Sequence, residues 1–140
     1  IKETVIQKYL KMKITFLHLV CTVPQIIQQK KSKSDIDIEL KDKMEDEEYL
    51  NILHKNLKEL NKNKYDFIFY IAGVDIHHED RLGKLKISDY GINKRDRIVI
   101  ENFYSKNIPL CGVLGGGYNK SFEKLIELHS MLHKNCAEII

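Results

Sequence analysis

The order of its candidate strands and helices constrains the fold of this 140-residue chain more than any other feature. Three short segments rich in β-branched and aromatic residues are each followed by a longer amphipathic segment. The strand candidates are residues 14–20, 65–72 and 109–114, and the helix candidates are residues 46–60, 88–105 and 121–137. Strands that alternate with helices pair in parallel, because the helix returns the chain to the start of the sheet. The pattern predicts an α/β fold with a mainly parallel sheet flanked by helices.

Individual segments give sharper predictions. Acidic residues in the first turn and an apolar stripe favour a helix over residues 46–60, and Ser88 is placed to cap the next helix. The continuous apolar run 65–72 predicts a strand covered on both faces. For the last helix we expect a buried stripe that consists of Phe122, Leu125, Ile126, His129, Leu132 and His133.

Composition points to a soluble intracellular protein. Hydrophobic residues make up 43% of the chain and charged residues 31%, which is typical of a globular domain. The three cysteines have no CxxC spacing, which favours reduced thiols and a cytoplasmic location, or a nuclear one in a eukaryote. No apolar run is long enough to span a membrane. The net charge of +3 is too small to predict nucleic-acid binding, and the basic run 30–33 is interpreted as a solvated loop.

The loop 73–83, which follows the second strand candidate, is dense in ionisable groups. Carboxylates and imidazoles are ligands of zinc and similar ions, and Asp75 is better placed than His77 or His78, since adjacent side chains usually point apart. The alternative is a polar surface loop in which Asp80 and Arg81 form an ordinary solvated pair.

A second loop, Gly115–Tyr118, follows the third strand candidate. Its three glycines permit positive φ angles and close backbone approach. Because a helix follows, the loop could cradle an anion, although a nucleotide-binding motif ending in Gly-Lys-Ser or Gly-Lys-Thr is lacking. Tyr118 could donate a hydrogen bond to a developing oxyanion, or it could simply pack at the start of the helix.

The remaining histidines favour packing roles. His129 and His133 have the i, i+4 spacing of a metal-chelating pair, but they lack the glutamate of an HExxH motif. His18, which lies near Cys21, is interpreted as a core or loop residue.

Several motifs, in order and at natural spacing, together resemble one family. They are Ser34–Leu40, Asp46–Leu50, Tyr70–Asp75, Asp80–Gly83, Lys84–Ser88, Lys94–Asp96 and Gly115–Tyr118. They look like the C-terminal portion of the histone deacetylase superfamily, and they are most similar to its class IV and bacterial branch. The resemblance covers residues 34–140, whereas residues 1–33 match poorly, so we place a boundary between these two parts.

The resemblance implies an arginase/deacetylase-like fold, with zinc at the carboxyl edge of the sheet, and a hydrolase that acts on acetyl-lysine or small acetyl amides. Asp75 would be a zinc ligand, and Tyr118 would be the catalytic residue that polarises the acetyl carbonyl. Gly115, Gly116 and Gly117 would lie beside the substrate, while Asp80, Arg81 and Gly83 would support the loop.

Other parts of the family site are not visible in this sequence. The family takes two further zinc ligands and a general-base His-His pair from earlier segments, and His77-His78 is not that pair because it follows the ligand Asp75. We therefore expect the domain to be incomplete, with an upstream fragment of the same domain as its partner. The alternative is a non-catalytic remnant or an interaction module. A nucleotide-binding module that uses Gly115–Gly117 ranks last.

Overall fold

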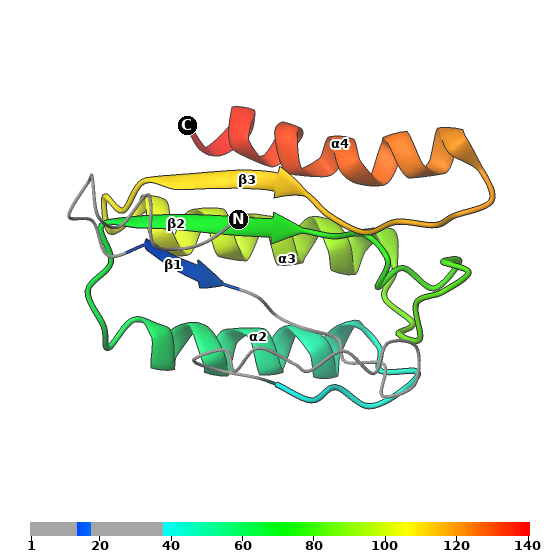
Figure 1. Cartoon of the computed structure of the whole chain (residues 1–140), viewed down its shortest axis with the longest axis horizontal. Coiled ribbons are helices and arrows are strands. Elements are labelled where there is room, and N and C mark those ends of the chain that lie inside the picture. Colours follow the sequence, from blue (N-terminus) through cyan, green and yellow to red (C-terminus); the bar gives the residue numbers. More distant parts are fainter. Residues whose placement is uncertain (1–13, 18–37) are drawn as a thin grey trace.

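The computed structural model describes residues 14–17 and 38–140 of the chain. Three strands alternate with three helices, as the sequence predicted (Figure 1). The elements are β1 (Ile14–Leu17), α2 (Asp46–Leu60), β2 (Phe67–Ala72), α3 (Asp89–Tyr104), β3 (Leu110–Leu114) and α4 (Phe122–Ile139). The predictions for His18, Cys21, Pro24 and the loop 25–34, and the boundary placed before Ser34, lie outside the described residues.

The sheet is parallel throughout, in the order β1-β2-β3. Ile14 of β1 pairs with Phe67 of β2, and Ile68 of β2 pairs with Leu110 of β3. Because both neighbours run parallel to β2, the loops that follow β2 and β3 leave the sheet at the same edge (Figure 1). The fold therefore brings together the two loops in which the sequence places its candidate site residues.

Helix α3 lies between the other two helices and contacts both. Its start is fixed by Ser88, whose Oγ accepts a hydrogen bond from the Gly91 N–H at 3.1 Å, as predicted. Asp46, at the start of α2, accepts the Ser88 N–H at 2.8 Å and also the Ser88 hydroxyl. A Cβ atom on Gly91 would lie 2.2 Å from Asp46 Oδ1, so only glycine permits this contact. The first turns of α2 and α3 are thereby joined.

The core consists of two clusters of buried side chains. One lies between β2 and the helices and includes Leu53, Leu57, Leu60, Ile68, Tyr70, Ala72, Val99, Ile100, Phe103 and Leu132. The other supports the loop after β2 and includes Met44, Tyr49, Val74, Ile76, Leu85, Ile87, Ile92, Leu128 and Met131. The second cluster places a hydrophobic base under the candidate site.

The prediction that β2 is covered on both faces is wrong. Ile68, Tyr70 and Ala72 are buried, whereas Ile71 between them is 38% exposed. Successive residues of a strand point to opposite faces, and the chain buries only one face of β2 completely.

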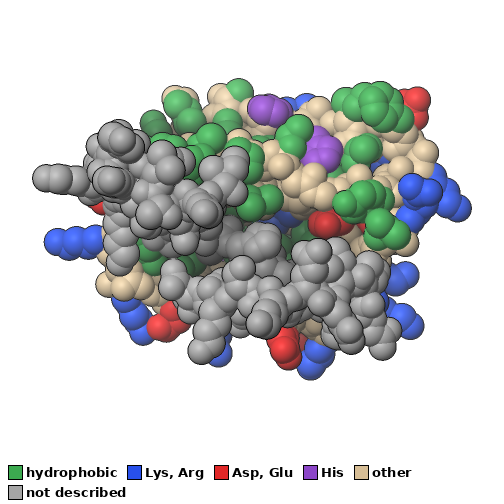
Figure 2. Space-filling view, in the orientation of Figure 1, with side chains coloured by type: hydrophobic (Ala, Val, Ile, Leu, Met, Phe, Trp, Pro, Cys, Tyr) green, Lys and Arg blue, Asp and Glu red, His purple; other side chains and the backbone are tan. Residues whose placement is uncertain are grey.

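The buried stripe predicted for α4 is also partly wrong. Phe122 and Ile126 are 69% and 52% exposed, and His133 is exposed. Figure 2 shows apolar side chains gathered at this N-terminal end of α4. The residues buried on α4 are Leu128, Met131, Leu132 and Asn135. The buried face includes a polar residue because Asn135 Nδ2 donates to the Asn93 carbonyl of α3 at 3.2 Å.

Phe103 and Tyr104 offer a matched test of the core. Phe103 is fully buried between β2 and the helices, whereas Tyr104 is 50% exposed. We expect Phe103→Ala to lower the free energy of unfolding by about 3–5 kcal/mol, because it leaves a cavity. Tyr104→Ala is expected to change it by about 0.5 kcal/mol or less. Urea denaturation of both variants checks this, and equal losses would contradict the core assignment.

Candidate functional site

The Asp80 carboxylate joins the loop after β2 to the loop after β3. Asp80 Oδ1 accepts the backbone N–H groups of Leu82 and Gly83, both at 2.8 Å. Asp80 Oδ2 accepts the Tyr118 N–H at 2.6 Å, and Arg81 Nε donates to the Tyr118 carbonyl at 2.9 Å. The ion pairs of the described segments do not include an Asp80–Arg81 pair. Both residues instead hold the Tyr118 backbone.

Asp75 lies directly against the Gly-rich loop. The Val74 N–H donates to the Gly116 carbonyl at 2.6 Å, and a Cβ atom on Gly116 would lie 2.3 Å from Asp75 Oδ2. A Cβ atom on Gly115 would lie 2.7 Å from the Gly73 Cα. None of the chain's glycines, all of which are described, has a positive φ angle. Glycine is therefore required in this loop for close approach and not for a positive φ angle.

The electrostatic surroundings of Asp75 favour a bound cation over a bound anion. Burial raises the pKa of Asp75, and the neighbouring charge of Asp80 raises it further, while Arg95 and His129 act in the opposite direction. Two carboxylates close together gain from a cation between or beside them. A phosphate at Gly115–Gly117 would face this negative charge, which weighs against the anion-cradle interpretation.

Arg95 supports the Asp75 loop from beneath. Its side chain is 4% exposed, and its Nη1 donates a hydrogen bond to the Gly73 carbonyl. The guanidinium also pairs with Asp96, whose Oδ1 lies 2.8 Å from Arg95 Nη2. The Tyr70 hydroxyl donates to the same carboxylate oxygen. From the sequence, Arg95 and Asp96 stood out only as part of the family resemblance. Their spacing from Ile92, on the buried face of α3, is a signal that could have revealed them.

Tyr118 is held through its backbone, and its side chain is 46% exposed. No residue of the described part of the chain forms a hydrogen bond with its hydroxyl. The phenol is therefore open to a molecule that reaches this edge of the sheet, which differs from the alternative of a tyrosine packed at a helix start.

The histidines are arranged differently from expectation. The rings of His77 and His78 lie 4.2 Å apart rather than pointing away from each other. His129 is partly buried, and its Nε2 would lie 3.2 Å from a Cβ atom on Gly117. Its Nδ1 is buried without a hydrogen-bond partner in the described part of the chain, and burial lowers its pKa. His133 is exposed, so the packing role predicted for it is wrong. In the described part of the chain, neither His129 nor His133 belongs to a group of three candidate metal ligands.

Asp75 is a suitable zinc donor, but the described residues do not complete a catalytic zinc site around it. Such sites use about three protein ligands. Within residues 14–17 and 38–140, the one group of three candidate ligands is His77, His78 and Glu79, which excludes Asp75. The residues present thus fit one part of a zinc site and not the whole.

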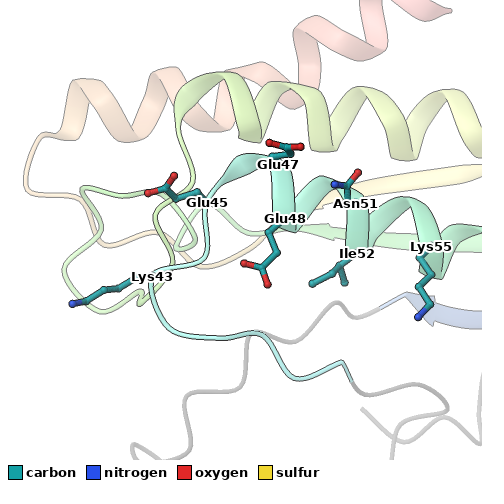
Figure 3. Close-up of a pocket in the computed structure, with 7 residues that line it drawn as sticks. All are labelled: Lys43, Glu45, Glu47, Glu48, Asn51, Ile52 and Lys55. Carbon is teal, nitrogen blue, oxygen red and sulfur yellow. The ribbon is translucent and has the colours of Figure 1, made fainter.

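A wide hollow of about 680 Å³ lies elsewhere, beside the first turns of α2 (Figure 3). Its lining is mainly charged and consists of Lys43, Glu45, Glu47, Glu48, Asn51, Ile52 and Lys55. Lysines and glutamates of an open surface are usually solvated, and this hollow contains none of the candidate site residues.

A profile of the histone deacetylase domain matches residues 21–132. The chain belongs to the histone deacetylase family. An uncharacterised protein of Picosynechococcus sp. is 39% identical over 110 residues, which are 78% of this chain and 37% of that protein. Histone deacetylase 2 of Arabidopsis thaliana is 42% identical over 81 residues, 57% of this chain and 21% of that protein. The recognition from sequence motifs is confirmed.

The fold class is confirmed by solved structures. An acetylpolyamine aminohydrolase from Burkholderia pseudomallei superposes with a TM-score of 0.61 at 15% identity, over 71% of this chain and 28% of that one. This histone deacetylase-family chain thus spans well under half the length of the relatives that it matches. None of its described helices is long and apolar enough to cross a membrane.

The raised pKa of Asp75 predicts a stability cost at neutral pH. The native chain holds this proton more tightly than the unfolded chain does, so the group's contribution is full below about pH 3.9 and is lost as pH rises through the folded pKa. We therefore expect Asp75→Asn to be more stable than the unaltered chain at pH 7, with the difference shrinking toward pH 4. Urea denaturation at both pH values measures this.

Asp42→Asn serves as the control for that comparison, because Asp42 is an exposed acid whose ion pair with Lys84 spans 3.5 Å. We expect this variant to gain no stability at pH 7. Equal gains in the two variants would show that general charge removal, rather than the surroundings of Asp75, is responsible.

Proposed function

We propose that this chain provides the Asp75 and Tyr118 side of a zinc-dependent deacetylase site, and that it is incomplete alone. The observation that carries the proposal is the contact between the two loops. Asp80 accepts the Tyr118 N–H, and the absence of a side chain at Gly116 leaves room for the Asp75 carboxylate. A carboxylate ligand and a free phenol at one edge of a parallel sheet suit acyl transfer to water.

Each residue has a separate task in this proposal. Zinc, when bound, would activate water and polarise the acetyl carbonyl. Asp75 would contribute one ligand to that ion, with its position set by the contact with Gly116. The Tyr118 hydroxyl would donate a hydrogen bond to the oxygen that becomes negative when water attacks the amide. Asp80 and Arg81 would keep the Tyr118 backbone from moving during this step.

We propose that the missing ligands and the general base come from an upstream part of the same domain. The length of the relatives leaves room for such a part. Leu114, Phe122 and Ile126 are each more than half exposed around the Gly-rich loop, and Figure 2 shows apolar surface at the N-terminal end of α4. Exposed apolar surface of this kind is typical of an interface.

Acetyl-lysine and small acetyl amides are the substrates that we propose. One relative is named a histone deacetylase and one structural neighbour an acetylpolyamine aminohydrolase. Both names describe hydrolysis of an acetyl amide on an alkyl amine by those proteins.

The test is complementation by the part of the Picosynechococcus relative that the match does not cover, fused to or mixed with this chain. We expect hydrolysis of an acetyl-lysine peptide, and a rate lowered about 10²–10³-fold by Tyr118→Phe, because the oxyanion loses a donor. Tyr104→Phe, at an exposed tyrosine at the C-terminal end of α3, should leave the rate unchanged. Full activity of Tyr118→Phe would overturn the assigned role.

The second candidate function is a non-catalytic remnant or interaction module. It is favoured by the incomplete ligand set around Asp75 in the described residues. This alternative would be supported by a folded complex that does not hydrolyse the peptide and whose zinc content is the same with and without Asp75→Ala.

A further inference from the structure

We propose that His77, His78 and Glu79 form a second binding site, for a divalent transition-metal ion such as Zn²⁺, separate from the Asp75 position. One ligand atom from each residue lies within 4.8 Å of the other two. Imidazole nitrogens and a carboxylate oxygen are donors that such ions accept readily. The inference does not depend on the proposed deacetylase function.

The hydrogen-bond partners of His77 fix which of its nitrogens is free for a metal. His77 Nε2 lies 2.8 Å from Asp89 Oδ1, which only accepts, so Nε2 carries the proton. His77 Nδ1 accepts the Glu79 N–H at 3.3 Å, so it carries a lone pair that a metal ion could use in place of this long hydrogen bond. A histidine that donates one ring N–H to a carboxylate while its other nitrogen points at a cluster has the arrangement found in most metal-bound histidines.

His78 is fixed in the complementary way. Its Nδ1 lies 3.3 Å from the Ile87 carbonyl, which also only accepts, so the proton is on Nδ1 and the lone pair is on Nε2. Nε2 lies 4.0 Å from Glu79 Oε1. One ring nitrogen of each histidine and one carboxylate oxygen of Glu79 lie together in one small region.

The surroundings hold His77 rigidly and leave the other two ligands adjustable. The His77 side chain is 1% exposed, and Lys124 occupies the second oxygen of Asp89. Burial acts to raise the pKa of Asp89, but hydrogen bonds from Lys124 and His77 outweigh this and lower it, so Asp89 is ionised at neutral pH. The side chains of His78 and Glu79 are 45% and 53% exposed.

Metal entry requires only a small rearrangement. Donor atoms around a tetrahedral zinc lie about 3.3 Å apart, given zinc–nitrogen distances of about 2.0–2.1 Å. The candidate ligand atoms lie within 4.8 Å of one another, so they need to close by at most about 1.5 Å. The ion would displace the long Glu79 N–H bond to His77. Glu79 also accepts from Asn119 at 3.4 Å, so the ion would brace the loop that carries Tyr118.

The test is equilibrium dialysis of the 140-residue chain against Zn²⁺ in an Asp75→Ala background, which removes the other candidate ligand. We expect about one zinc per chain, lost in the double variant His78→Ala/Glu79→Gln. Both altered residues are exposed, so the fold should persist, and circular dichroism verifies this. Asp89→Asn should weaken zinc affinity roughly 10–100-fold, because it removes the carboxylate that orients His77.

His133→Ala is the matched control, since His133 is an exposed histidine on α4. It should leave zinc binding unchanged if the ion is held by the proposed cluster. Absence of bound zinc in the Asp75→Ala chain, or zinc that survives the double variant, would overturn the proposal. Loss of zinc only on Asp75→Ala would instead support the deacetylase site alone, so the two proposals fail separately.

Discussion

The carboxylate of Asp80 is the interaction on which the arrangement of this site depends. It accepts three backbone N–H groups, two from its own loop and one from Tyr118. Hydrogen bonds to an ionised acceptor are stronger than neutral ones. Here they hold two loops that have no helix or strand of their own. Because β2 and β3 are parallel neighbours, both loops begin at the same edge, and one side chain is sufficient to join them.

A buried ion pair lies next to the start of the Asp75 loop. Arg95 and Asp96 bury opposite charges next to Tyr70, whose pKa is raised, chiefly by burial. Buried ion pairs seldom add net stability, because desolvation offsets their attraction. The pair instead fixes a position, because the guanidinium also donates a hydrogen bond to the Gly73 carbonyl, where the Asp75 loop starts. The ion pair therefore positions the loop rather than stabilising the fold.

The local features of this fold were predictable from sequence, and the features that depend on packing were not. Acidic residues and Ser88 correctly marked the starts of α2 and α3, because capping acts within a few residues. The buried face of α4 was misjudged, since Asn135 is buried through a partner on α3 and Phe122 has no cover in the described part of the chain. The closeness of His77 and His78 likewise depends on Asp89 and Ile87, which anchor each ring from outside the loop.

The Asp80–Tyr118 hydrogen bond can form only late in the synthesis of the chain. The carboxylate and the N–H that it accepts are separated by 38 positions, with α3 and β3 between them. A ribosome releases the loop that holds Asp80 well before the Tyr118 loop, so Asp80 Oδ2 lacks its Tyr118 partner until β3 has docked on β2. The two loops therefore reach their joined arrangement only after the chain has been made as far as Tyr118.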